Sequence, residues 1–134
     1  AMEEMMVGRG SQYAWAAVDA SQNPLDGGKS YRLRLPPNIP VKDFWSIIVY
    51  SNQTRSMIQT DQQFPSVSSL TKGLLVNEDG SVDVWFGPKA PPGKEKNWVQ
   101  TVLGKGWNTI LRLYGPFEPW FSKKWRPGEI ELQP

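Results

Sequence analysis

The sequence predicts an all-β fold: an antiparallel two-sheet sandwich, jelly-roll-like, with one short helix near the C-terminus. Twelve Gly and twelve Pro among 134 residues interrupt the chain too often for long helices. Short alternating apolar runs recur with turn residues between them, and no strand–helix–strand pattern appears. Only 39% of the residues are hydrophobic, but seven Trp and five Phe can anchor a core. We therefore treat residues 1–134 as a single β-sandwich domain.

The first part of the chain contains two predicted strands. Residues 1–10 are polar and Met-rich, and they are expected to form a short helical turn or a frayed lead-in. Alternation over 13–18 predicts a strand with a large aromatic face, and 19–28 carries Asn-Pro and Asp-Gly turn signals. Residues 31–35 alternate between apolar residues and Arg, which predicts a half-exposed strand with its Arg side chains outward.

The middle of the chain contains a strand that is expected to be covered on both faces. Residues 44–50 (FWSIIVY) are apolar at both alternating sets of positions. A turn over 51–54 predicts a hairpin with a second strand over 55–60, which a polar loop over 61–72 follows.

A second hairpin is predicted around Asp79-Gly80. These two residues separate the runs 74–77 and 81–86, and Asp-Gly between alternating runs is the strongest short hairpin signal. We therefore expect the two runs to pair as adjacent antiparallel strands.

A third hairpin is predicted around Gly104-Lys105-Gly106. This turn separates the runs 98–102 and 107–114. The first run begins with Trp98 and the second with Trp107, and both rings are expected to anchor the core.

The C-terminal part has weaker signals. Pro119 near the start and Pro127-Gly128 after the end predict one or two helical turns over 118–125. Residues 129–132 alternate and predict a last short strand.

The composition excludes several kinds of chemistry. There is no His and no Cys, which removes the Ser-His-Asp triad, thiolate and disulfide chemistry, and most zinc and iron sites. We therefore expect no cofactor and no metal, and we favour a protein that is not an enzyme. A net charge of +2 gives no field that favours nucleic acid, and no apolar run is long enough to be an integral membrane segment. Composition leaves the compartment open.

Arg112 is the residue of the 107–114 run that most needs an explanation. It lies between two Leu, so on a strand it points to the opposite side from them and to the same side as Tyr114. A buried Arg needs a charged partner, because its desolvation otherwise costs several kcal/mol. We expect Arg112 to pair with Asp61 or Asp83 from another strand, and the alternative is an open clamp for an external anion.

Amides and charges are concentrated along the predicted hairpin and its exit, at Asn52, Gln53, Arg55, Gln59, Asp61 and Gln62. Because Arg55, Gln59 and Asp61 occupy alternate positions, their side chains are expected to share one face. Polar groups beside aromatic rings suit a sugar or another polar small molecule. The alternative is a plain solvent-facing sheet surface.

A family resemblance rests on blocks of residues spread along the chain. They are GSQYAW at 10–15, FWS at 44–46, Tyr50, NQTRSM at 52–57, QTDQ at 59–62, FPS at 64–66, DGSVD at 79–83, FGP at 86–88, NW at 97–98, QT at 100–101, GKGW at 104–107, LRLYGP at 111–116, PWF at 119–121 and WRPG at 125–128. Together they resemble the C-terminal jelly-roll family called domain of unknown function 1214. The resemblance implies the sandwich, a bacterial and often exported protein, and a second uncharacterised domain that usually precedes this one. It implies no catalytic residues.

Three functions stay open on the sequence alone. The first is a non-catalytic binding or assembly module for a polar small molecule, a sugar or an adjacent domain. The second is a component of a carboxylate-based hydrolase completed by a missing partner domain, and the third is a self-associating structural domain. The predicted ligand-binding residues are Arg55, Gln59, Asp61, Asp83, Trp98, Gln100, Arg112 and Tyr114.

Overall fold

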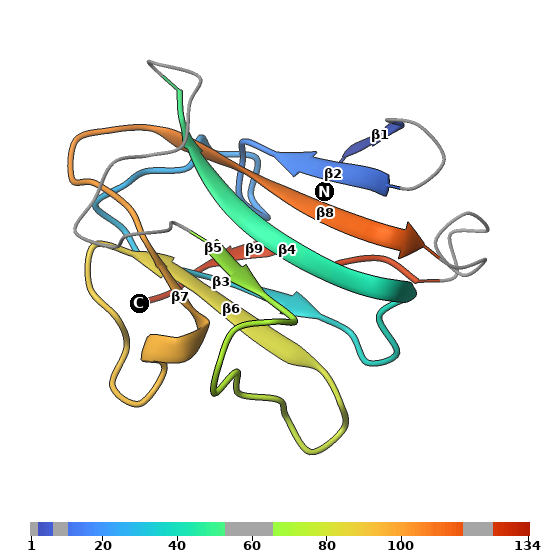
Figure 1. Ribbon diagram of the computed structural model, residues 1–134. Helices are drawn as coiled ribbons and strands as arrows, with labels where there is room; N and C mark the ends of the chain where they lie inside the picture. Colours follow the sequence, from blue (N-terminus) through green and yellow to red (C-terminus); the bar gives the residue numbers. More distant parts are fainter. Residues whose placement is uncertain (1–2, 7–10, 53–65, 117–124) are drawn as a thin grey trace.

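The computed structural model describes residues 3–6, 11–52, 66–116 and 125–134, and the structural statements below concern these residues. They form two β-sheets that lie as two layers (Figure 1). The five-stranded sheet has the order β1-β2-β8-β4-β5, with β1 at Glu3–Met6, β2 at Ser11–Ala16, β8 at Trp107–Pro116, β4 at Val41–Ser51 and β5 at Ser66–Ser68. The four-stranded sheet has the order β7-β6-β3-β9, with β7 at Trp98–Gln100, β6 at Val82–Gly87, β3 at Tyr31–Leu35 and β9 at Ile130–Leu132. The predicted all-β, two-sheet sandwich is confirmed.

The core lies between the two sheets, because alternate residues of the long strands point inward. The fully buried side chains include Leu33, Leu35, Ile47, Val49, Val84, Phe86, Trp107, Leu111 and Leu113. Trp107 is the largest of them, and its ring lies 4.8 Å from that of Phe86 and 5.6 Å from that of Tyr31, centroid to centroid. The predicted core anchor at Trp107 is therefore confirmed, whereas Trp98 is only half-buried.

Strand β3 has the orientation that its alternation predicts. Tyr31, Leu33 and Leu35 are buried, while Arg34 is exposed and Arg32 is half-buried on the other side. Short strand β9, which the sequence also predicts, pairs with β3 in antiparallel register.

The hairpin predicted around Gly104-Lys105-Gly106 is wrong. Strand β7 belongs to the four-stranded sheet, where it pairs in parallel with β6, and β8 belongs to the five-stranded sheet. Hydrogen bonds from Thr101 tie the segment between these two strands to two other parts of the chain. The Thr101 N–H donates to Gly87 O at 3.0 Å, and the Thr101 hydroxyl donates to Gly27 O at 2.8 Å. The Gly-Lys-Gly turn therefore carries the chain from one sheet to the other, and the β6–β7 pair departs from the all-antiparallel prediction.

The strand predicted over 74–77 is also absent. The Asp79-Gly80 turn does form, with the Asn77 N–H donating to Ser81 O at 2.8 Å and Gly80 at a φ of +89°. The backbone of Leu75, however, pairs with the side chain of Asn97 and not with a strand. Only the second arm of this predicted hairpin, β6, is a strand.

One further predicted element is wrong, and two lie wholly or mostly outside the described residues. Residues Glu3–Met6 form strand β1, paired with β2, in place of the predicted helical or frayed lead-in. The predicted strand over 55–60 lies outside the described residues, and so does most of the helix predicted over 118–125. Within the described residues the one helical segment is a 3-10 turn at Glu95–Asn97.

Candidate ligand-binding site

The outer face of the five-stranded sheet carries aromatic and polar side chains in place of a plain solvated surface. Strands β2, β4 and β8 lie next to one another there, and their outward positions bear half-buried side chains: Tyr13, Trp15, Phe44, Ile48, Tyr50, Asn108, Ile110, Arg112 and Tyr114. Phe44 and Tyr114 stack at 4.2 Å between ring centroids with an angle of 17°. This face is thus a continuous stripe across three strands, which we call the β2–β8–β4 face.

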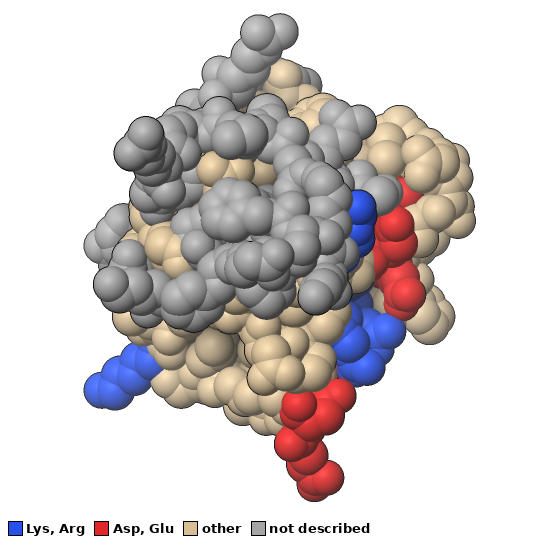
Figure 2. Space-filling view, turned by 90° about the vertical axis from the view of Figure 1, so that its right-hand side faces the viewer, with Lys and Arg blue, Asp and Glu red and all other residues tan. Residues whose placement is uncertain are grey.

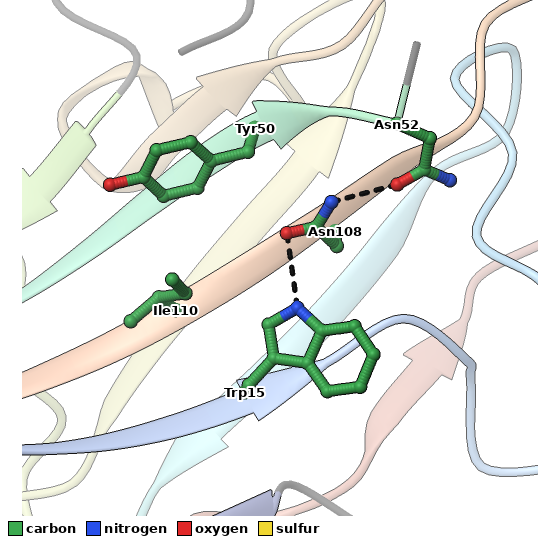
Figure 3. A pocket seen from close by; sticks show the side chains of 5 residues that line it. All are labelled: Trp15, Tyr50, Asn52, Asn108 and Ile110. Carbon is green, nitrogen blue, oxygen red and sulfur yellow. Dashed lines mark hydrogen bonds between the residues drawn. The ribbon is translucent and has the colours of Figure 1, made fainter. Parts of the chain in front are cut away.

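A pocket of about 530 Å³ lies at one end of the β2–β8–β4 face. It is lined by Trp15, Tyr50, Asn52, Asn108 and Ile110 (Figure 3). Register places these residues together, because Trp15 is opposite Ile110 across β2 and β8, and Tyr50 is opposite Asn108 across β4 and β8. The volume falls within the roughly 300–1,000 Å³ of small-molecule sites.

Hydrogen bonds hold the polar groups of this pocket in place. The Trp15 indole N–H donates to Asn108 Oδ1 at 3.1 Å, and Asn108 Nδ2 donates to Asn52 Oδ1 at 2.7 Å. Figure 3 shows Asn108 between the other two side chains. Each carboxamide has two N–H donors, so the second donor of Asn108 and both donors of Asn52 lack a partner in the described part of the chain.

The described lining residues can recognise hydroxyl groups but offer little for acid–base chemistry. Trp15 and Tyr50 supply flat apolar rings, and the side-chain amides of Asn52 and Asn108 supply both hydrogen-bond donors and acceptors. None of the described lining residues is a carboxylate or a cation. The described residues also include no group of three potential metal ligands.

Arg112 lies further along β8 on the same face and is framed by tyrosines. Its guanidinium carbon lies 4.2 Å from the ring centroid of Tyr13 and 5.5 Å from that of Tyr114, and Nη1 donates to the Tyr114 hydroxyl at 2.6 Å. Burial opposes the charge, but the hydrogen bond and charge interactions with the tyrosines outweigh burial and raise the pKa of Arg112 above its ordinary value. Arg112 is therefore a permanent cation in an aromatic setting.

The structure brings together only part of the predicted site. Arg112 and Tyr114 are neighbours on the β2–β8–β4 face. Asp83, Trp98 and Gln100 belong to β6 and β7 of the other sheet. Three further predicted residues lie outside the described part of the chain: Arg55, Gln59 and Asp61.

The predicted pairing of Arg112 with Asp83 is wrong, because Asp83 has another partner. Arg34 on β3 donates from Nε and Nη2 to the two carboxylate oxygens of Asp83, at 2.8 and 3.0 Å. Asn77 Nδ2 donates to the same carboxylate at 3.2 Å. The Arg34 hydrogen bonds, helped by that of Asn77, outweigh burial and lower the pKa of Asp83 below its ordinary value.

Replacing Asp83 with Asn is expected to destabilise the fold near neutral pH and to matter less in acid. The folded-state pKa lies below the ordinary 3.8, so the ionised carboxylate stabilises the fold above that value and loses this effect as the pH falls through the folded pKa. The gap in urea midpoint between wild type and Asp83→Asn should be largest at about pH 7 and should shrink as the pH falls below 3.8 and through the folded-state pKa. A gap that does not change with pH would contradict this role of the pair.

Sequence reasoning missed most of the pocket. Asn52 was placed in a polar cluster, but Trp15, Tyr50, Asn108 and Ile110 were not predicted as site residues. A usable signal was present, because Asn108, Ile110 and Arg112 occupy alternate positions of one strand and must share a face.

Charged side chains of both signs are mixed on the described surface. Figure 2 shows acidic and basic side chains next to one another along one edge of the molecule. The ion pairs Arg32–Glu131 and Arg34–Asp83, at 2.9 and 2.8 Å, account for such mixing on the four-stranded sheet. Among the described residues, no helix has the length and apolar character needed to cross a membrane.

The fold and its motifs define a family. The family model described as "Protein of unknown function (DUF1214)" matches residues 10–118, so the chain belongs to this family and the resemblance seen in the sequence is confirmed. A comparison with curated proteins gives no match.

The solved structures that are similar to this chain include the following two. The VPA0106 protein from Vibrio parahaemolyticus has a TM-score of 0.79 and 25% identity, over 93% of this chain and 31% of that one. An uncharacterized protein from Burkholderia cenocepacia has a TM-score of 0.52 and 19% identity, over 92% of this chain and 28% of that one. The chain thus spans less than a third of either structure.

Proposed function

We propose that this domain is a non-catalytic binding module that holds a polar, hydroxyl-rich small molecule, such as a sugar, on the β2–β8–β4 face. The observation that carries the proposal is the pocket in which Trp15 and Tyr50 lie beside two hydrogen-bonded amides. Aromatic rings stack on the apolar faces of sugars, and fixed amides bond their hydroxyl groups. Because Asn108 is held by Trp15 and Asn52, its side chain loses little freedom when a ligand binds.

The hydrolase alternative finds less support among the described residues. General acid catalysis needs a carboxyl group that is protonated near the working pH. The pKa of Asp83 is lowered, and Arg34 occupies both of its oxygens. The part of the pocket lining that the structure describes contains no carboxylate.

Calorimetric titration with a panel of short oligosaccharides tests the proposal. We expect saturable binding of at least one compound and about tenfold weaker binding by Asn108→Ala, because a hydrogen-bonding amide is lost. Gln100→Ala, on β7 of the other sheet, is the matched control and should keep the wild-type affinity. The proposal fails if no compound binds, or if Gln100→Ala weakens binding while Asn108→Ala does not.

Docking of an adjacent domain is a second candidate for this face. It is favoured by one specific observation, namely that the chain spans less than a third of the two similar structures. If this face docks an adjacent domain, the isolated chain should bind no compound of the oligosaccharide panel but should bind that domain. Sedimentation of the isolated chain would separate docking from self-association, which alone predicts a mass that rises with concentration.

A further inference from the structure

Arg112 differs from the other two arginines of the described strands because no described carboxylate pairs with it. Arg32 and Arg34, on the outer face of the four-stranded sheet, pair with Glu131 at 2.9 Å and Asp83 at 2.8 Å. Within the described part of the chain, the ring and hydrogen-bond partners of the Arg112 guanidinium are Tyr13 and Tyr114. A half-buried cation without a counter-ion leaves a favourable interaction unmade, which an incoming anion can supply.

The unpaired edge of the Arg112 guanidinium is complementary to a carboxylate. Nη1 is occupied by the Tyr114 hydroxyl, while Nε–H is buried without a partner among the described residues. Nη2 likewise has no hydrogen-bond partner among the described residues. Nε and Nη2 form one edge, and Arg34 uses that same edge to hold both oxygens of Asp83.

The tyrosines hold this edge in a fixed orientation. Tyr13, opposite Arg112 in the β2–β8 register, lies under the guanidinium at 4.2 Å, and Tyr114 fixes Nη1. A guanidinium that is already oriented loses little freedom when it binds a carboxylate.

The free edge and the pocket belong to one surface. Asn108, Ile110 and Arg112 are alternate residues of β8 on the same face, so about 13 Å of strand separates the backbone of Asn108 from that of Arg112. Trp15 and Tyr13 continue the same line on β2. A single elongated ligand can therefore reach both the amides and the cation.

We propose that the ligand is an acidic oligosaccharide, whose hydroxyl groups lie in the Trp15–Asn108 pocket and whose carboxylate binds the Nε–Nη2 edge of Arg112. This inference rests on the proposed function and adds to it the charge of the ligand. Arg112 has no carboxylate partner among the described residues. A planar guanidinium binds a carboxylate through two parallel N–H···O hydrogen bonds.

The test compares a short oligouronide with the same oligomer after its carboxylates have been reduced to alcohols. Calorimetric titration of the full chain should give roughly 10- to 100-fold tighter binding of the acidic form, as expected for charge-assisted hydrogen bonds. Arg112→Gln should remove this preference, and Arg112→Lys should keep only part of it because Lys lacks the fork. Arg32→Lys, on the opposite sheet, should leave the preference unchanged, and circular dichroism checks that each variant is folded.

The outcomes separate this inference from the proposed function. Equal affinity for the two forms, or a preference that survives in both folded Arg112 variants, would overturn the role of Arg112 and leave the sugar pocket standing. Weaker binding of both forms by Asn108→Ala supports the pocket independently of charge. If neither form binds, both the proposed function and this inference are rejected.

Discussion

Replacing Trp107 with Ala is expected to lower the free energy of unfolding by about 3–5 kcal/mol. The side chain is fully buried and packs on the rings of Phe86 and Tyr31, which belong to the opposite sheet. Its removal leaves a cavity between the two layers, and the loss approaches the whole stability of an ordinary domain, about 5–15 kcal/mol. Urea unfolding followed by circular dichroism measures the change.

Trp107→Phe is the matched control, and it separates volume from hydrogen bonding. The Trp107 indole N–H is buried without a partner in the described part of the chain. Phe therefore removes no hydrogen bond, and the loss should be less than half that of Ala because most of the ring remains. Equal losses in the two variants would contradict the packing role given to this residue.

Replacing Asn97 with Ala is expected to cost about 2–3 kcal/mol, the second largest effect. Asn97 is 1% exposed, and its carboxamide acts like a peptide group of a strand. Oδ1 accepts from the Leu75 N–H at 2.9 Å, and Nδ2 donates to Leu75 O at 2.9 Å and to Asp83 O at 2.8 Å. Ala leaves these three backbone groups without their partner, which chemical denaturation can measure.

Asn97→Asp gives a sharper form of the same test. The carboxylate still accepts from Leu75, but its second oxygen faces two carbonyl oxygens, so ionisation is disfavoured and the pKa of the new Asp should be raised. A raised carboxyl pKa destabilises the fold at neutral pH and less so in acid, where the protonated group can donate. The deficit relative to wild type should shrink as the pH falls towards about 4; a deficit that grows instead would contradict the bonding pattern.

Local alternation predicted most of the long strands but not their partners. It missed β1 and β5, which lies within the predicted loop over 61–72, and it predicted a strand over 74–77 that does not form. The outward Arg side chains of β3 and the buried Trp107 follow from the pattern of apolar residues. The assignment of β7 and β8 to different sheets does not, because it depends on the distant bonds of Thr101 with Gly27 and Gly87. In the same way, nothing local to Leu75 shows that Asn97 takes the place of a strand beside it.

The candidate site was predictable only where one strand contained it. Arg112 and Tyr114 lie two residues apart, so alternation places them on one face. Trp15 and Asn52 come from segments far away in the sequence, and the sheet order β2-β8-β4 brings them to Asn108. Charge alone also suggested Asp83 as the partner of Arg112, since the sequence contains no sign that Arg34 is closer.

The central claim is that the β2–β8–β4 face binds a hydroxyl-rich ligand, and nitrogen–proton correlation NMR tests it most directly. During titration with the oligosaccharides, the indole N–H signal of Trp15 and the side-chain amide signals of Asn108 should shift in a saturable way. The indole signals of Trp98 and Trp125, which donate to Gly87 O and Pro36 O away from this pocket, should stay in place. Shifts confined to Trp98, or no shift of Trp15 with any compound, would contradict the claim.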